Sequence, residues 1–164
     1  MNAQQPPGCY PISVKGVVVR AGRVLLLRNE REEWELPGGR LEIGEAPEEC
    51  VAREITEETT WQVVTGPLLD VWMYHIVHAE RHVFVVTYGC HLPTGAQTPD
   101  PVLSHEHTQV ALFTEAEVPA LVMPQGYKNS IAAWYTTLRN GDTGTARVDR
   151  SQPTQLRSSH EATR

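Results

Sequence analysis

The segment of this sequence with the most residues capable of chemistry runs from 36 to 61 and reads LPGGRLEIGEAPEECVAREITEETTW. Seven of the chain's 20 acidic residues lie in it, and all seven are glutamates, the first at Glu42 and the last at Glu58. Like charges three or four residues apart on a helix repel each other and destabilise it. Either another group must offset this repulsion, or the carboxylates serve a purpose that outweighs it.

A helix over residues 47–59 would place three of these carboxylates together. The stretch has no glycine, and its one proline stands at the first position, where a helix tolerates it. At roughly 100° per residue, Glu54, Glu57 and Glu58 fall within an arc of about 100°, beside an apolar stripe formed by Val51 and Ile55. Such a row of carboxylates suits a hard divalent cation that takes oxygen ligands, Mg²⁺ first and Mn²⁺ second. The competing interpretation is an ordinary solvated acidic face.

The loop before this helix favours the metal site over the solvated face. Gly38 and Gly39 let the backbone turn closely, so that a carbonyl oxygen at Gly39 can join the metal ligands. Arg53 lies beside the acids on the helix and can form an ion pair with Glu45 of the loop. Such a pair would fix the loop and the helix to each other.

These residues resemble the signature of the Nudix hydrolases. The family pattern is Gly, five residues, Glu, seven residues, Arg-Glu, an aliphatic, any residue, Glu-Glu, any residue, Gly, an aliphatic. Here it begins at Gly39, continues through Glu45 and runs through residues 53–59, REITEET. The end departs from the pattern, because Thr60 stands in place of the glycine and Trp61 in place of the aliphatic. The glycine normally caps the helix in a left-handed conformation, so the departure concerns the helix end and no metal ligand.

The resemblance implies a fold, an activity and a set of site residues. The fold is a mixed sheet sandwiched between helices, and the activity is hydrolysis of a nucleoside diphosphate linked to another group, X. Water would attack one phosphorus, and the metal would polarise the phosphoryl oxygens and acidify the water. The residues carried over as metal ligands are Glu54, Glu57, Glu58 and the carbonyl of Gly39, and Arg53 with Glu45 would be the structural ion pair.

The general base is open between two kinds of residue. In the family it is a glutamate either of the signature or of a later loop, and Glu106 in the sequence SHEH lies in such a loop. The competing base is Glu54. The predicted catalytic residues are therefore Glu54, Glu106 and also Glu57. His105 and His107 alternate and would share a face of an extended segment, which could bind a transition metal, but histidines on surface loops are much commoner than such sites.

Substrate recognition is only weakly encoded. The candidates to stack on a base or meet a phosphate, most of them equally explicable as core or surface residues, are Trp34, Trp72, Tyr74, Tyr127, Arg28 and Arg81. The favoured substrate is a nucleoside diphosphate sugar such as ADP-ribose, and a MutT-type nucleoside triphosphate pyrophosphohydrolase is the alternative. A nucleotide-sensing module without catalysis is the alternative of another class. It is disfavoured because such modules commonly lose signature glutamates, and all are present here.

The elements that must position these residues form an α/β (α+β) pattern. Residues 17–20 and 24–28 predict a β-hairpin around Ala21-Gly22, and residues 61–77 and 81–92 predict two strands joined by a turn. Residues 109–113 predict another strand. Thr114 and Glu117 predict a capping box before a short helix, and residues 126–140 predict an amphipathic final helix. Hairpins make much of the sheet antiparallel or mixed, with helices flanking it.

Composition limits the domain count and the partners. At 164 residues and 40% hydrophobic content, we expect one domain over 13–140, preceded by an N-terminal arm over 1–12 and followed by a polar tail over 141–164. The net charge of −6 argues against nucleic-acid polymers and anionic membranes as partners and leaves a nucleotide-type small molecule. Three widely spaced cysteines fit a reducing cytoplasm. The sequence leaves open whether two chains form a homodimer.

Overall fold

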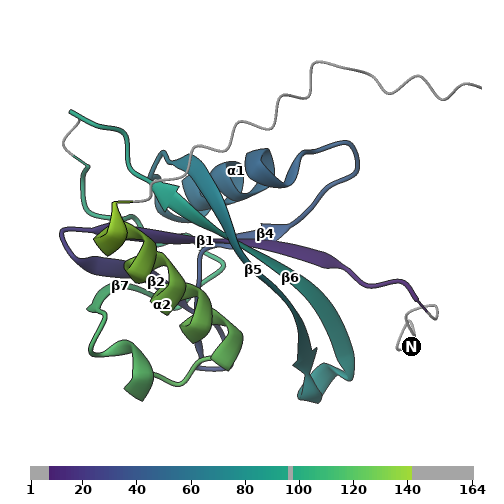
Figure 1. The fold of residues 1–164 in the computed structure, drawn as a ribbon. Helices are drawn as coiled ribbons and strands as arrows, with labels where there is room; N and C mark the ends of the chain where they lie inside the picture. The colour runs from purple at the N-terminus through teal and green to yellow at the C-terminus, as the bar shows by residue number, and fades with distance from the viewer. Residues whose placement is uncertain (1–7, 96–97, 142–164) are drawn as a thin grey trace, which may run out of the picture.

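A mixed β-sheet carries one helix on each face in the computed structural model, which describes residues 8–95 and 98–141 (Figure 1). The strands are β1 Ile12–Arg20, β2 Arg23–Arg28, β3 Trp34–Glu35, β4 Gly38–Arg40, β5 Val64–Ile76, β6 Arg81–His91 and β7 Gln109–Thr114. Their order is β3-β2-β1-β6-β5, with β4 paired to β1 and β7 to β2. Strands β1 and β6 are parallel and the other pairs are antiparallel, so the predicted mixed sheet is confirmed.

The two α-helices are α1, Pro47–Thr59, and α2, Gln125–Asn140. The first has the bounds predicted from the sequence, and the second begins one residue before the predicted start. Two short 3₁₀ helices, η1 Val77–Ala79 and η2 Val118–Ala120, complete the described elements. Thr114 donates to Glu117 through its backbone N–H at 2.7 Å and its hydroxyl at 2.8 Å, and the turn that follows is the short η2.

Alternation along the central strands divides the core between the two helices. On one face, Val14 and Val18 of β1 pack with Val51 and Ile55 of α1. On the other, Val17 packs with the α2 residues that include Ile131 and Trp134. Successive strand residues point to opposite faces, so β1 anchors both halves of the core. The apolar stripe of α1 is thereby buried, and its acidic residues are left at the edge of that interface.

The hairpin of β5 and β6 extends past the helices (Figure 1). Strand β5 lies at the edge of the sheet, and its register with β6 shifts between Thr65 and Leu68 and again between Leu68 and Asp70. Such bulges increase the local twist. The hairpin therefore bends away from the plane of the sheet centre and gives the molecule a projecting wall.

The predicted domain boundaries stay predictions. Residues 1–7 of the predicted arm and 142–164 of the predicted tail lie outside the described residues, and β1 begins at Ile12, the last residue assigned to the arm. No helix in the described part of the chain is both long and apolar enough to cross a membrane.

Helix α1 ends at a threonine in the left-handed conformation. Thr60 has φ 64° and ψ −1°, and its backbone N–H donates to the Thr56 carbonyl at 2.9 Å. The resembled signature has glycine at this position, so the backbone shape is kept although the residue differs. Trp61, which replaces the aliphatic residue, is fully buried and donates from Nε1 to the Pro99 carbonyl at 2.9 Å.

We expect Thr60→Gly to stabilise the protein by about 1 kcal/mol, because a left-handed conformation costs a Cβ-bearing residue roughly that much. Thr60 is exposed, so little packing is lost. Chemical denaturation of the variant measures the gain. Thr136→Gly, at an exposed position inside α2, is the matched control and should destabilise by about 0.5–1 kcal/mol. A fall in stability for both variants would contradict the cap.

Candidate active site

The acidic residues of α1 are held in place by one arginine. Arg53 donates from Nε and Nη2 to the two carboxylate oxygens of Glu45, at 2.7 and 3.1 Å. Its Nη1 donates to Glu54 at 2.9 Å and to Glu57 at 3.2 Å. The hydrogen bonds from Arg53 hold the pKa of Glu45 at about 2. The guanidinium thus offsets the repulsion among three carboxylates and ties the loop to the helix.

The two glycines before α1 make room for the carboxylates behind them. A Cβ at Gly39 would lie 2.5 Å from the Glu54 carboxylate, so only glycine lets that carboxylate lie against the backbone. Gly38 has φ 131°, in the region that favours glycine, and its N–H donates to Glu58 at 2.7 Å. Strand β4 and helix α1 are therefore joined by the side chains of the predicted metal ligands.

A network of buried charges lies beneath these residues. Lys15 of β1 donates from Nζ to the Gly38 carbonyl at 2.6 Å and lies 3.8 Å from Glu35. The His107 Nε2 lies 3.0 Å from Glu35 and 3.8 Å from Glu58. These contacts link β1, β3, β4, α1 and the loop before β7, so several separate parts of the chain fix the floor of the site.

Burial and the neighbouring charges shift the pKa values of this network in different directions. Burial alone would lower the pKa of Lys15, but the neighbouring acidic groups, of which Glu35 contributes most, together outweigh burial, and the pKa lies above its usual value. Burial tends to raise the pKa of Glu35, yet Lys15 and the His107 hydrogen bond hold it at about 2. Burial raises the pKa of Glu58 to about 7, although Lys15 and the Gly38 amide favour its ionised form. A cation bound at Glu58 would favour ionisation further.

The sequence-predicted catalytic and metal residues line one cavity of about 540 Å³. Those that line it are Gly39, Arg53, Glu54, Glu57, Glu58 and Glu106. Glu45 lies behind them, on Arg53. Glu106 is exposed in a turn at the rim of the cavity. The side chain of its neighbour His107 is buried, and its Nε2 lies 3.0 Å from the Glu35 carboxylate. His105 is exposed, so the two histidines lie in different surroundings and do not form a shared metal site.

Sequence reasoning missed Lys15, Glu35 and the part played by His107. Lys15 interrupts the otherwise apolar run of β1 at an inward position, and this interruption was the available signal. Glu35 stands in a two-residue strand that gives no periodicity to interpret. Neither pattern distinguishes a buried charge from an exposed one, because burial depends on the distant partner.

The donor set of the cavity fits a hard divalent cation. Glu54, Glu57 and Glu58 offer carboxylate oxygens from one wall, and the glycine backbone opposite them carries no side chain. Among residues 8–95 and 98–141, no three His, Cys, Asp or Glu side chains already converge on one point, because Arg53 holds Glu54 and Glu57 while the Gly38 amide holds Glu58. The side chains would exchange these partners for the cation. Cys50 contacts the backbone of Gly39 and Arg40 through its sulfur and is buried.

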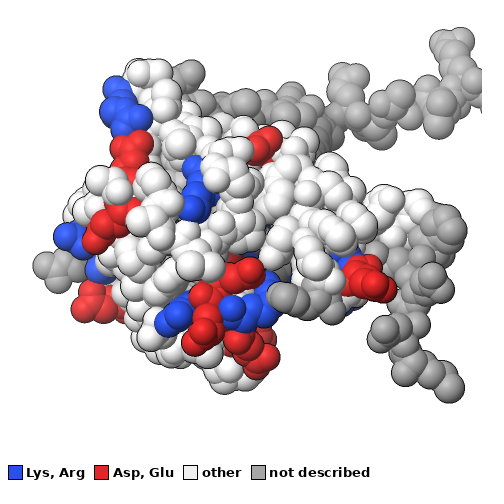
Figure 2. All heavy atoms as spheres, turned by 90° about the horizontal axis from the view of Figure 1, so that it is seen from below, with Lys and Arg blue, Asp and Glu red and all other residues white. Residues whose placement is uncertain are grey.

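A second cavity of about 280 Å³ adjoins the first and shares Lys15, Arg31, Glu35 and Arg40 with it. Of the predicted substrate-binding residues, it is lined by Tyr74, Tyr127 and Arg81. On the face seen in Figure 2, acidic and basic side chains adjoin each other in mixed patches, so no uniformly acidic surface repels a nucleotide there. The second cavity adds apolar and aromatic walls to the polar first one.

The remaining predicted substrate residues pack elsewhere. Trp34 lies edge-on to Phe113, with ring centroids 4.7 Å apart, and Arg28 lies over Trp34. Trp72 packs between Tyr127 and the backbone of α2 at Gly126, where an added Cβ would collide with its ring. Trp34, Trp72 and Arg28 line neither of these two cavities.

Comparison with known proteins agrees with this geometry. The family model described as the NUDIX domain matches residues 10–135. A "MutT-like protein" of Streptomyces ambofaciens is 38% identical over 119 residues, which are 71% of each chain. A "Putative ADP-ribose pyrophosphatase YjhB" of Bacillus subtilis is 30% identical over 134 residues, 79% of this chain and 62% of that one. The solved structure of a MutT protein from Methanosarcina mazei Go1 has a TM-score of 0.65 at 25% identity, covering 84% of this chain and 99% of that one.

A mixed sheet between two helices, a glycine-rich loop and a glutamate-bearing helix define a pyrophosphohydrolase of nucleotide substrates, and the chain belongs to the Nudix hydrolase family. It is an enzyme that acts on phosphoanhydride bonds, and its family typically depends on a divalent metal.

We expect Gly39→Ala to lower kcat by about 100-fold, because the added Cβ displaces the Glu54 carboxylate and misplacement by about 1 Å at a reacting centre costs that much. Turnover is measured together with the melting temperature. The fold should survive, since Gly39 does not have the positive φ of Gly38. Wild-type turnover in a correctly folded variant would show that the position of Glu54 against this glycine does not matter.

Proposed function

We propose that the chain cleaves the pyrophosphate linkage of a nucleoside diphosphate joined to another group, and that its substrates are nucleotide sugars of the ADP-ribose type. The observation that carries the proposal is the pair of adjoining cavities. The first is polar and acidic and suits a cation with a diphosphate, while the second has Tyr74, Tyr127 and aliphatic walls that suit a ring. A substrate lying across both would hold its diphosphate at the shared residues.

In this proposal the chain's residues have separate roles. Glu54, Glu57, Glu58 and the Gly39 carbonyl hold a divalent cation, with Mg²⁺ preferred and Mn²⁺ accepted. When bound, the cation would polarise the phosphoryl oxygens and acidify the attacking water. The ion pair of Arg53 with Glu45 fixes the position of the loop relative to the helix. Lys15 and Arg40, which line both cavities, supply positive charge toward the diphosphate.

Glu106 is the proposed general base, with Glu54 as the alternative. Glu106 is exposed at the rim of the acidic cavity, where it can reach a water without being part of the helix network. Glu54 is already held by Arg53 at 2.9 Å. A base must be free to accept a proton from the attacking water, and this difference favours Glu106.

A MutT-type nucleoside triphosphate pyrophosphohydrolase is the second candidate function. It is favoured by the similarity to the MutT-like protein of Streptomyces ambofaciens, which is the more identical of the two relatives described above. The non-catalytic sensing module is disfavoured because all the signature glutamates are present and the three predicted metal ligands, Glu54, Glu57 and Glu58, line the same cavity.

The deciding experiment is a phosphate-release assay with a coupled phosphatase over a substrate panel, with Mg²⁺ and with excess EDTA. We expect ADP-ribose to be cleaved with a higher kcat/KM than any nucleoside triphosphate, and turnover to stop in EDTA. A higher kcat/KM for triphosphates would establish the MutT-type function instead. Full turnover in excess EDTA would rule out the metal-dependent mechanism.

Replacement of Glu57 and of Glu106 by glutamine should impair the enzyme in different ways. Glutamine keeps the shape and loses the charge, so Glu57→Gln should weaken metal binding and be partly rescued by more Mg²⁺. Glu106→Gln should lower kcat by about 10²–10⁴, as expected for loss of a general base, at every metal concentration. Initial rates over a Mg²⁺ series measure both.

The two outcomes that would contradict these roles are distinct. A Glu106→Gln rate within a few-fold of wild type would make Glu54 the base. A Glu106→Gln rate restored by added Mg²⁺ would make Glu106 a metal ligand.

A further inference from the structure

The β5–β6 hairpin has two faces of different character. The inward face of β6 carries Arg81, Val83 and Val85, and the inward face of β5 carries Tyr74 and Ile76 opposite them, with Ile76 paired to Arg81 and Tyr74 to Val83. All five line the second cavity. The wall of that cavity is therefore apolar and aromatic except at the tip of the hairpin, where Arg81 adds a guanidinium.

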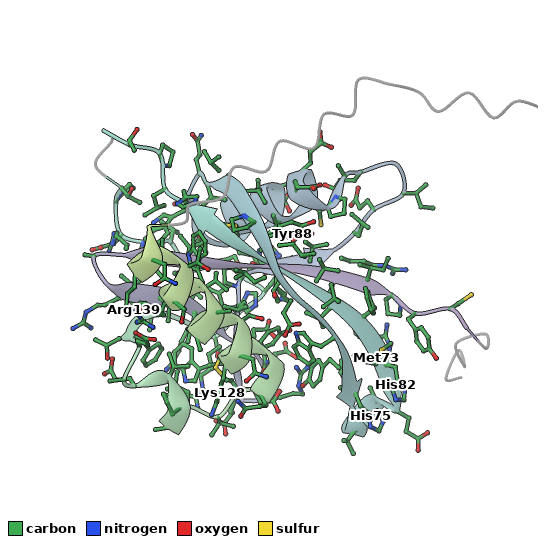
Figure 3. The ribbon with its side chains drawn as sticks, in the orientation of Figure 1. Met73, His75, His82, Tyr88, Lys128 and Arg139 are labelled. Carbon is green, nitrogen blue, oxygen red and sulfur yellow. The ribbon has the colours of Figure 1, made fainter. Side chains whose placement is uncertain are left out.

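The opposite face carries the neighbouring residues of each strand. His75 and His82 lie side by side near the hairpin tip, with their rings stacked at a centroid distance of 4.3 Å (Figure 3). Because successive strand residues point to opposite faces, the stacked histidines fix the direction of their neighbour. Arg81 is thereby directed toward the cavity and away from the surface on which His82 lies.

Arg81 lies far along the hairpin from Lys15, one of the residues that the two cavities share. In the parallel pairing of β1 with β6, Lys15 lies beside Thr87. Arg81 lies six positions before Thr87 along β6, which corresponds to about 20 Å of strand. Lys15 and Arg40 face the acidic cavity as well, whereas Arg81 lines the second cavity and not the first. Along the strands that wall the second cavity, Lys15 and Arg81 thus lie at opposite ends, and apolar and aromatic side chains lie between them.

Within the described part of the chain, the Arg81 side chain has no carboxylate partner, unlike those of Arg31 and Arg53. Arg31 pairs with Glu33 at 3.1 Å and Arg53 with Glu45 at 2.7 Å. Among the residues that the structure describes, no ion pair or hydrogen bond involves the Arg81 side chain. In a chain with a net charge of −6, an unpaired guanidinium above an apolar wall is suited to bind an anion supplied by the substrate.

We propose that Arg81 binds a second anionic group of the substrate, of the phosphate class, carried by the ring-bearing moiety that occupies the second cavity. The preferred substrate is then a nucleoside diphosphate derivative with a further phosphate outside the scissile diphosphate. This inference rests on the proposed function, since it assigns the part of the substrate that lies beyond the diphosphate.

The test compares ADP-ribose with two derivatives, each of which carries one phosphate more than ADP-ribose. In one derivative the added phosphate is at the 2′ position of the adenosine, and in the other it is at the 1″ position of the terminal ribose. For the wild type, kcat/KM for one derivative should exceed that for ADP-ribose by about 10- to 100-fold, as expected for a hydrogen-bonded phosphate–arginine pair. The position that gains shows which end of the substrate enters the second cavity.

Three variants identify Arg81 as the source of the gain. Arg81→Gln should bring the ratio of derivative to parent close to one, and Arg81→Lys should recover part of it, because lysine keeps the charge and loses the planar fork. Arg23→Gln is the matched control at the start of β2, outside both cavities, and should keep the wild-type ratio. Melting temperatures confirm that each variant is folded.

A ratio near one for both derivatives in the wild type would overturn the proposal, as would an unchanged gain in Arg81→Gln. Failure to cleave ADP-ribose and both derivatives would overturn the proposed function instead. Calorimetric binding of the same three compounds to the wild type and Arg81→Gln would then decide the Arg81 proposal alone. Equal affinities for all three compounds would overturn it.

Discussion

The repulsion among the carboxylates of α1 is the constraint on which the rest of the site depends. A single guanidinium, that of Arg53, contacts Glu45, Glu54 and Glu57. It binds both carboxylate oxygens of Glu45 but only one oxygen each of Glu54 and Glu57, the two of these acids that line the cavity. Glu45 comes from the loop, and the other two acids come from the helix. The guanidinium charge that offsets the repulsion on the helix therefore also sets the distance between the loop and α1. Stability and the arrangement of ligands are therefore produced by one interaction.

A second set of charges supports the first from below. Removing one partner of a buried ion pair typically costs about 3–5 kcal/mol, because the other charge is left without compensation. Lys15 and Glu35 are such partners, and with the hydrogen bond between His107 and Glu35 they connect the sheet to the end of α1 through Gly38 and Glu58. These groups meet where β4 pairs with β1 and where His107, from the loop before β7, reaches Glu35 of β3. The polar floor thus keeps Glu58 oriented without exposing the core to water.

The sequence predicted local features well and long-range ones poorly. The bounds of α1 follow from a leading proline and an uninterrupted stretch without glycine, and the β1–β2 hairpin follows from its turn residues, so both depend on neighbours in the chain. The burial of Lys15 depends on Glu35, which is distant in sequence, and could not be seen. Trp72 and Tyr74 look equivalent in the sequence and lie on the same face of β5, yet Trp72 packs under α2 while Tyr74, two residues nearer the hairpin tip, lines the second cavity. Thr60 shows the converse, because the left-handed cap persists without glycine when the N–H of the capping residue still reaches Thr56.

The central claim is that the carboxylates beside Arg53 form a divalent-cation site, and the free energy of unfolding as a function of Mg²⁺ at constant ionic strength tests it most directly. A cation that binds only the folded chain should add about 2.7 kcal/mol at a hundredfold excess over its Kd. Glu54→Gln, which keeps the shape of the side chain and removes one charged ligand, should gain less at every Mg²⁺ concentration. An equal gain in the wild type and the variant, or no gain in the wild type at concentrations that saturate turnover, would contradict the claim.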